Sequence, residues 1–479
     1  MNMKKTTIKH RVLAICSAAV ACTLLFSGCS TGGTSSSSSS APTASVDLTS
    51  GPEVDLTFWH SMGGTNANAL QTMVDDFNNQ HAGHIKVTAQ YQGSYDDAIN
   101  KFKSAMVAKS GPDIMQSYEL GTRYLIDSGF IEPMQDFINK DKWDVKQIDA
   151  NIAAYYTVQG KLYSMPFNSS TPILYYNKDM FKEAGLDPAN PPKTFEEIIN
   201  DAPKLTKKDA SGNVTQSALG MYVYGWFLDQ SLNKMGKPSF DNGNGRTKAP
   251  TKIVFDTNGG GKTFLDMYQQ LLKTGTMPAY AMKDADGQAA FVNGKLAMYI
   301  NSTAGLAGLL KAINGKFDLG TAYYPAIDSK SVNGGVSIGG ASLWMTKNSD
   351  ARVMEAKWEF IKFMASAKEQ AYWNTLTGYF PINVGAYNEQ TFKDNVKKYP
   401  QFQTAIDQLH ASSKSSVGGL CAIYTQVRKI EETEMQKMLN NQQSSDEALK
   451  NMASQIDGAM QDYNCLLYTS DAADEGLGV

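Results

Sequence analysis

The sequence contains few cysteines, no basic stripe and only one long apolar run. Of the five cysteines among 479 residues, Cys16 and Cys22 lie in that apolar run near the amino terminus, and Cys421 and Cys465 lie near the carboxyl end. This distribution excludes a disulfide framework and a cysteine-based metal site. The formal net charge is −3 with lysine and arginine scattered, so nucleic-acid binding is not expected. No second long apolar run follows Phe26, so we expect no membrane span in the rest of the chain.

The amino terminus has the pattern of a secretory signal. Basic residues up to Arg11 precede the apolar run over 12–26 and the small residues before Cys29. This run is shorter than the roughly 20 residues of a transmembrane helix, which indicates a cleaved signal peptide. Phe-Ser-Gly-Cys resembles a bacterial lipobox, although leucine is commoner at the position of Phe26. We predict a lipoprotein signal peptide over 1–28, with Cys29 diacylated and the protein anchored to the cell membrane on its extracellular or periplasmic side; an ordinary signal peptide with an incidental cysteine is the alternative.

The segments on either side of the central body differ from it in composition. Residues 29–52 are rich in serine, threonine, glycine and alanine, which predicts a flexible tether. After Tyr463 the sequence looks like translated sequencing-adaptor read-through, so we interpret 464–479 as a non-native tail that breaks away from the helix before it. The remaining body of about 415 residues is long enough for two to three domains with their own cores.

Strand and helix patterns alternate in the first part of the body. Apolar residues of one helical face recur at Leu70, Met73, Val74 and Phe77, the spacing of i, i+3, i+4 and i+7. The whole pattern predicts, in order, a strand, a helix, a strand, a helix and a strand over 54–60, the segment around 70–77, 85–91, 96–108 and 114–118. Such alternation is typical of an α/β fold with a mostly parallel sheet and helices on both faces.

Polar residues follow several of these strands where they end. In α/β sheets ligands bind beyond the carboxyl ends of the strands, which is where Tyr95 and Glu119 are expected. The stretch 166–181 places Asn168, Ser169 and Ser170 before an apolar strand at 173–176, and we expect these three side chains to be exposed to a cleft. A second strand ends in small polar residues at Ser302, and a helix beginning near 302–305 would offer free backbone N–H groups to an anion.

Two glycine-rich segments invite different interpretations. Gly339 and Gly340 precede a strand and can bring bare backbone close to a ligand. The segment 259–263, Gly-Gly-Gly-Lys-Thr, suggests a phosphate-binding loop, but the position five before Gly261 is Asp256 rather than glycine. We therefore interpret it as a turn before a helix over 264–272.

Several short motifs together resemble one family. These motifs are Trp59-His60-Ser61-Met62, Tyr91-Gln92-Gly93-Ser94-Tyr95, Phe167-Asn168-Ser169-Ser170-Thr171-Pro172, Tyr175-Tyr176-Asn177-Lys178-Asp179, Pro191-Pro192-Lys193-Thr194, Gly339-Gly340-Ala341-Ser342 and Thr377-Gly378-Tyr379. Over about 54–428 the chain is similar to the extracellular solute-binding proteins of ABC importers, within their glycerol-3-phosphate-binding branch. The resemblance implies a two-lobed fold that the chain crosses three times, near 167–172, 299–303 and 365–368. The lobe boundaries expected from it are 53–168 with 302–365, and 169–301 with 366–463.

The resemblance also implies roles for single residues. Tyr95 and Glu119 would hold glycerol hydroxyls. The phosphate would be held by a set that combines hydroxyls, backbone and one fixed cation: Ser170, Ser302, Gly340, Tyr379 and Arg428. Relatives carry tryptophan where this chain has Phe195, and the smaller ring could admit a substituent on the phosphate, as in glycerophosphocholine. Glycerol-3-phosphate and a glycerophosphodiester both remain open.

The expected function is that of a lipid-anchored receptor that delivers its ligand to ABC permease subunits. We expect a monomer that performs no catalysis and needs neither cofactor nor metal. One alternative is a receptor for an oligosaccharide, which a cleft rich in exposed tryptophan faces would favour. Another is an enzyme on the same fold with Cys421 as nucleophile, which requires Cys421 in the cleft beside a carboxylate.

Overall fold

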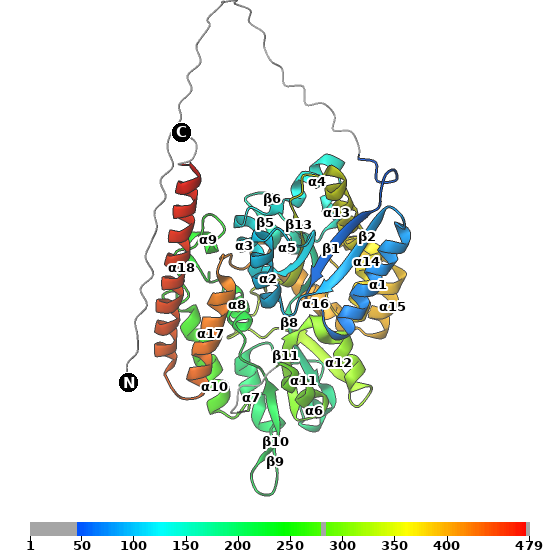
Figure 1. Ribbon diagram of the computed structural model, residues 1–479. Coiled ribbons are helices and arrows are strands. Elements are labelled where there is room, and N and C mark those ends of the chain that lie inside the picture. Colours follow the sequence, from blue (N-terminus) through cyan, green and yellow to red (C-terminus); the bar gives the residue numbers. More distant parts are fainter. Residues whose placement is uncertain (1–45, 279–283, 476–479) are drawn as a thin grey trace, which may run out of the picture. The chain divides into compact units, whose positions relative to one another are not determined.

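The computed structural model describes residues 46–278 and 284–475 (Figure 1). Its first sheet has the strand order β2-β1-β3-β13-β4, and β7 also pairs with β13. These strands are β1 (Val54–His60), β2 (Ile85–Tyr91), β3 (Ile114–Tyr118), β4 (Ile131–Glu132), β7 (Met165–Ser170) and β13 (Gly339–Thr346). The strands β1, β2 and β3 lie where the sequence pattern predicts them.

The second sheet has the order β12-β8-β11-β10-β9. Its strands are β8 (Pro172–Asn177), β9 (Lys207–Lys208), β10 (Val214–Gly220), β11 (Leu296–Ser302) and β12 (Leu319–Tyr323), and a separate hairpin joins β5 (Thr157–Val158) to β6 (Lys161–Leu162). Every residue of β8 is buried, which agrees with the apolar, β-branched and aromatic character predicted for 173–176.

Both sheets are mixed rather than mostly parallel. β1 runs parallel to β2 and β3, and β10 runs parallel to β11. β13 runs antiparallel to β3, β4 and β7, and β8 runs antiparallel to β11 and β12. The prediction followed local βαβ alternation, which produces parallel neighbours. Strands that enter a sheet from a distant part of the chain are free of that constraint and run the other way.

The chain passes between the two sheets at other places than expected. The step from β7 to β8 lies at Thr171, inside the predicted crossing. β12, however, pairs with β8 although it falls within 302–365, so the chain stays with the second sheet past Ser302. Trp373, from 366–463, belongs to the same core as Phe58 of β1. The expected boundaries at 302 and 366 therefore differ from the points where the chain changes sheet or core. The sequence of an amphipathic helix shows which of its faces is buried but does not show which sheet that face covers.

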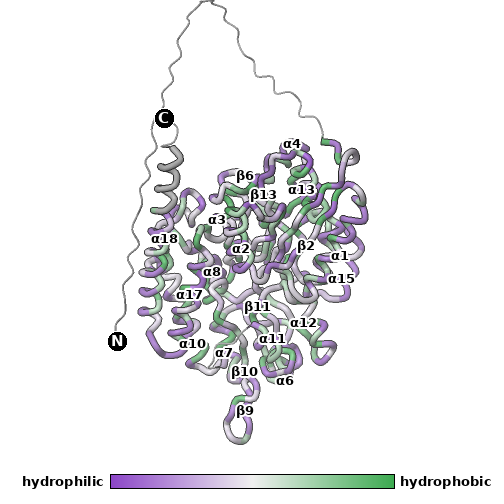
Figure 2. Tube along the Cα trace, viewed as in Figure 1, coloured by the Kyte–Doolittle hydropathy of each residue, from purple (hydrophilic) through white to green (hydrophobic). Residues whose placement is uncertain are grey.

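Helices surround both sheets (Figure 1). In chain order they are α1 (Gly64–Gln80), α2 (Tyr95–Val107), α3 (Thr122–Asp127), α4 (Met134–Asp141), α5 (Ala150–Tyr156), α6 (Lys178–Glu183), α7 (Phe195–Leu205), α8 (Gly225–Lys234), α9 (Asp241–Asn244), α10 (Gly260–Lys273), α11 (Asp284–Val292), α12 (Leu306–Ile313), α13 (Ala351–Met364), α14 (Ala367–Thr377), α15 (Gln390–Lys398), α16 (Gln401–Ala411), α17 (Tyr424–Leu439) and α18 (Ser445–Glu475). The predicted face of α1 is buried, and Figure 2 shows the outer helix α15 as mainly hydrophilic.

The carboxyl-terminal helix continues past the predicted break at 464. α18 runs to Glu475, and Asn464 donates a hydrogen bond to the backbone oxygen of Pro250 at 3.1 Å. No glycine or proline occurs between Gly458 and Gly476, so nothing in the local sequence ends the helix there. Part of α18 packs against α17 (Figure 1). None of the helices in 46–278 and 284–475 combines the length and apolar character that crossing a membrane requires.

The first turn of α7 offers a test of local stability. The Thr194 hydroxyl accepts a hydrogen bond from the backbone N–H of Glu197 at 3.0 Å, and the Glu197 carboxylate accepts one from the Thr194 N–H at 3.2 Å. Replacing Thr194 by alanine leaves the Glu197 N–H without this partner and is expected to lower the free energy of unfolding by about 1 kcal/mol. Urea unfolding of the Thr194→Ala and Thr194→Ser variants measures the effect. A serine variant as unstable as the alanine variant would contradict the capping explanation.

Candidate functional site

A cavity of about 560 Å³ lies where ends of strands from both sheets meet. The first sheet contributes the ends of β3 and β7 and the start of β13, and the second sheet contributes the end of β11. The residues that line it are Ser94, Tyr95, Asp96, Tyr118, Glu119, Ser170, Tyr222, Tyr224, Trp226, Asp284, Asn301, Ser302, Ala304, Gly340, Tyr379, Thr425, Arg428, Lys429 and Glu432. The cavity thus lies at strand ends, as expected for an α/β fold.

Almost all of the predicted site residues come together in this cavity. Its lining includes Tyr95, Glu119, Ser170, Ser302, Gly340, Tyr379 and Arg428. They arise from segments up to 333 positions apart in the sequence, from Tyr95 to Arg428. Folding therefore places the predicted hydroxyls, the carboxyl group, the glycine backbone and the guanidinium around one space.

Phe195 is the predicted site residue that folding does not bring to the cavity. It is fully buried at the first position of α7 and is absent from the described lining. Its ring packs edge-on against Tyr324 with centroids 5.9 Å apart, and Tyr324 stacks on Phe227 at 6.1 Å. Phe227 in turn packs edge-on against the cavity-lining Tyr222 at 5.3 Å, so Phe195 lies behind the cavity wall, and the expectation that it borders the cavity is corrected. Its aromatic character suits a core position equally well.

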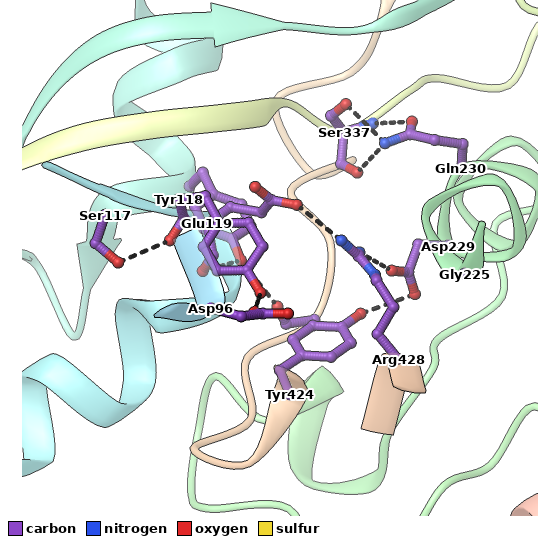
Figure 3. Close-up of polar contacts among 12 residues, drawn as sticks. Asp96, Ser117, Tyr118, Glu119, Gly225, Asp229, Gln230, Ser337, Tyr424 and Arg428 are labelled. Atoms are coloured by element: carbon purple, nitrogen blue, oxygen red, sulfur yellow. Dashed lines mark hydrogen bonds and ion pairs between the residues drawn. The ribbon is translucent and has the colours of Figure 1, made fainter. Parts of the chain in front are cut away.

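Arg428 on α17 is the buried cation of the cavity (Figure 3). Its Nη2 lies 2.7 Å from Oδ2 of Asp229 on α8, and its Nη1 lies 3.3 Å from Oε1 of Glu119, directly after β3. The rings of Tyr224 and Tyr424 lie 5.3 and 5.7 Å from the guanidinium carbon, within the range of cation–π attraction. Packing and two carboxyl groups thus hold the guanidinium in one orientation.

Further carboxyl groups lie near this guanidinium besides its two ion-pair partners. Burial raises the pKa of Glu119, although the charge of Arg428 opposes the shift. Burial also raises the pKa of Glu431 well above its usual range, with the charge of Asp229 as a second cause. The pKa of Glu432 is likewise raised by burial, while its Oε1 accepts a hydrogen bond from the Gly225 N–H at 3.0 Å. The surroundings of Arg428 are therefore acidic.

The predicted polar edge at 168–170 is buried rather than exposed, and Asn168 within it is hydrogen-bonded. Asn168 accepts a hydrogen bond from Gln116 at 2.8 Å and donates one to the Tyr95 hydroxyl at 2.9 Å. Tyr95 in turn stacks on Tyr118 with centroids 4.9 Å apart. Ser170 lines the cavity although it is only 3% exposed. The edge was predicted to be exposed because polar residues usually are, whereas here β7 pairs with β13 and covers them.

Gly340 brings bare backbone to the cavity wall, as predicted. Its φ is +90°, and a Cβ atom there would overlap the backbone oxygen of Asn168 on the paired strand. On the opposite wall, the Ser302 hydroxyl accepts a hydrogen bond from the Ala304 N–H at 3.2 Å and caps the short 3-10 helix before α12. One backbone donor of that helix start is therefore already satisfied.

Sequence reasoning missed important residues on the second sheet's side. Tyr222, Tyr224 and Trp226 line the cavity just after β10 ends, and Tyr222 stacks on Tyr224 at 5.4 Å. Asp229 supports Arg428 from behind. The aromatic run after the strand end at Gly220 was the available signal for the first three. No sequence signal indicated Asp229, because the contact spans 199 positions.

Cys421 does not meet the condition for a catalytic nucleophile. It is 3% exposed and is not among the described residues that line the cavity. Burial raises the pKa of its thiol to about 12, so the reactive thiolate is scarcely populated at neutral pH. The enzyme alternative therefore lacks the arrangement that it requires.

Comparison with known proteins gives the family. The family model of bacterial extracellular solute-binding proteins matches residues 72–404. The chain belongs to this family. It is 33% identical over 361 residues to the sn-glycerol-3-phosphate-binding periplasmic protein of Pectobacterium atrosepticum. The aligned residues make up 74% of this chain and 79% of that protein. The corresponding Escherichia coli K12 protein is 32% identical over 359 residues, covering 74% and 80%. The predicted membership of the solute-binding proteins is confirmed.

Solved structures of other solute-binding proteins share the fold. UgpB from Mycobacterium tuberculosis in complex with glycerophosphocholine superposes with a TM-score of 0.70 at 22% identity, covering 87% of this chain and 100% of that one. The cyclic α-maltosyl-1,6-maltose binding protein of Arthrobacter globiformis gives a TM-score of 0.68 at 22% identity, covering 86% and 100%. At these identities the likeness establishes the two-lobed α/β fold of this solute-binding protein.

Proposed function

We propose that the protein captures a glycerol phosphate ester in the 560 Å³ cavity and delivers it to the permease of an ABC importer. The observation that carries this proposal is the convergence of a buried guanidinium, the hydroxyls of Ser170, Ser302 and Tyr379, and the glycine backbone at 340 on one cavity. A phosphate needs several donors and a fixed cation, and the paired N–H groups of arginine suit its geometry. The identity of 32–33% to sn-glycerol-3-phosphate-binding proteins supports the same ligand class.

In this proposal the other predicted residues hold the glycerol. Tyr95 and Glu119 lie on the first sheet's side of the cavity and would bond to its hydroxyls. The protein binds its ligand without chemical change. Cys29, which lies outside the described residues, would carry the lipid that anchors the receptor on the extracellular or periplasmic side of the membrane. The Ser-rich tether over 29–52 would leave the receptor free to reach the permease.

The charge of the cavity favours a diester over glycerol-3-phosphate. Its lining includes four acidic residues, Asp96, Glu119, Asp284 and Glu432, against Arg428 and the exposed Lys429. A phosphate monoester brings up to two negative charges at neutral pH, whereas glycerophosphocholine brings one negative and one positive charge. Aromatic faces such as those after β10 also attract quaternary ammonium groups. We therefore favour a glycerophosphodiester with a cationic head group.

An oligosaccharide is supported less well. The oligosaccharide alternative would be favoured by a cleft rich in exposed tryptophan faces. Trp226 is the one tryptophan among the described residues of the lining, and it is only 4% exposed. An uncharged sugar, by contrast, would not supply the negative charge that stabilises a buried guanidinium.

Calorimetry on the purified protein tests the proposal. We expect glycerophosphocholine to bind in the micromolar range or tighter and glycerol-3-phosphate to bind more weakly, because of the acidic lining. Maltose is the control for the oligosaccharide alternative. Binding of maltose without binding of either phosphate ester would contradict the proposal, and so would any consumption of the bound ester.

A further inference from the structure

We propose that Glu119 becomes protonated when the protein captures its ligand. The ligand phosphate replaces Glu119 on Arg428, and Glu119 then takes up one proton from solution. This inference rests on the proposed function, since it requires that the ligand bring an anion to Arg428. It assigns to Glu119 a role that a glycerol contact alone does not require.

The two carboxyl partners of Arg428 are held differently (Figure 3). Asp229 lies 2.7 Å from Nη2, accepts a further hydrogen bond from the Tyr424 hydroxyl at 2.8 Å, and is not among the described residues of the cavity lining. Glu119 lies 3.3 Å from Nη1, and it does line the cavity. A ligand entering the cavity reaches the Glu119 side of the guanidinium. Asp229 can keep Arg428 in position while the Glu119 contact is exchanged.

Charge balance around Arg428 makes a proton necessary. Glu119, Asp229, Glu431 and Glu432 surround the guanidinium, and the first three are at most 7% exposed. Glu431 is fully enclosed, and its Oε2 has no hydrogen-bond partner among the described residues, which favours its neutral form. The pair formed by Asp229 and Glu119 already more than balances the one guanidinium. Placing a phosphate on Arg428 without a proton would set a further negative charge directly beside these two buried carboxyl groups, which is strongly unfavourable.

Glu119 is the group best placed to take this proton. Once the phosphate holds Arg428, Glu119 loses its counter-charge and faces a new anion, and both changes raise the pKa of its already buried carboxyl group further. As a neutral acid it can donate a hydrogen bond to a ligand oxygen. The titratable and charged groups that lie around Glu119 and Arg428 from neighbouring elements are Tyr95, Asp96, Tyr118, Tyr155, Tyr156, Tyr224, Asp229, Tyr379, Tyr424, Glu431 and Glu432. Burial raises the pKa of these tyrosines, so they stay neutral at physiological pH.

The proposal determines how affinity depends on pH. Because Glu119 has a higher pKa in the complex than in the free protein, the complex holds more protons. Affinity is therefore expected to rise as pH falls between these two pKa values, by at most about tenfold per pH unit for one proton. Below the lower pKa, Glu119 is protonated in both states and the dependence ends.

The test is calorimetric proton counting on the purified protein. Glycerophosphocholine is titrated at one pH in HEPES and in Tris, whose ionisation enthalpies differ, and the difference between the observed enthalpies gives the protons taken up per ligand. The diester is the suitable probe because it lacks the second phosphate ionisation near pH 6 of a monoester. Where only glycerol-3-phosphate binds, the same pair of titrations is made at pH 8. We expect an uptake approaching one proton.

Two variants identify the group that takes the proton. Glu119→Gln keeps the shape of the side chain and should abolish proton uptake and flatten the pH dependence of affinity. Glu432→Gln is the matched control, since Glu432 also lines the cavity but bonds to Gly225 rather than to Arg428, and it should retain the uptake. Ligand binding without proton uptake by the wild-type protein overturns the exchange while leaving the proposed function intact. Uptake that persists in Glu119→Gln overturns the role of Glu119, and absence of binding by either ester overturns the proposed function itself.

Discussion

Replacing Arg428 by alanine is expected to weaken the binding of glycerol phosphate esters by about 2–5 kcal/mol, or roughly 30- to 4,000-fold in Kd. The change removes the only cation among the buried residues described in the cavity lining. It also leaves Glu119 and Asp229 facing one another and the ligand phosphate without a counter-charge. Calorimetry with glycerophosphocholine and glycerol-3-phosphate measures the loss.

Two neighbouring variants separate charge from geometry. Arg428→Lys keeps the positive charge but cannot bond to two partners through a planar group, so we expect it to recover only part of the affinity. Lys429→Ala removes the next residue along α17, whose side chain is exposed, and should change affinity much less because water screens its charge. An Arg428→Ala protein that folds normally and binds with unchanged affinity would remove Arg428 from the site.

Replacing Gly340 by alanine is expected to destabilise the fold and impair binding together. The residue has φ +90°, where a side chain alone is unfavourable by roughly 1–2 kcal/mol, and the new Cβ atom would overlap the Asn168 oxygen. Relief of that overlap would move β13 away from β7 at the cavity wall and disturb the Asn168 contact to Tyr95. We expect the free energy of unfolding in urea to fall by at least about 2 kcal/mol, within the range of strained backbone sites.

Gly308→Ala is the matched control for this substitution. Gly308 lies inside α12, and a Cβ atom there has nothing within 4 Å. Alanine is favoured over glycine inside a helix by roughly 0.5–1 kcal/mol, so this variant should be slightly more stable than the wild type and should bind normally. Equal stability changes for the two variants would contradict the strain assigned to residue 340.

Much of the local structure could be predicted from periodicity. The helical face of Leu70, Met73, Val74 and Phe77 is buried as expected, and β1 and β2 begin and end at the predicted residues. Periodicity succeeds in these places because each element has one buried side and one exposed side. Apolar and polar residues therefore alternate along the element with its own period, and a short stretch of sequence shows this. The direction in which β13 or β8 enters its sheet leaves no such local trace.

The candidate site was predicted largely through short motifs that resemble the family. The resemblance could group Tyr95, Glu119 and Arg428 because it assigns a role to each motif whatever its distance along the chain, and all three line the cavity. The motifs failed at Phe195, where a matching position proved to be core. They also could not indicate that Arg428 is held by Asp229, because Asp229 stands in no recognised motif.

The sequence by itself determined the class of this protein: an α/β body without a disulfide framework, strands that end in polar residues, and the residue types of an anion site. Only the tertiary structure decided which of those residues share a cavity and which carboxyl groups balance the guanidinium. The physical reason is distance along the chain. The contact between Arg428 and Glu119 spans 309 positions, and it forms only when α17 packs against the end of the first sheet. Local patterns record the side on which a residue is buried, whereas packing of distant segments selects its partner.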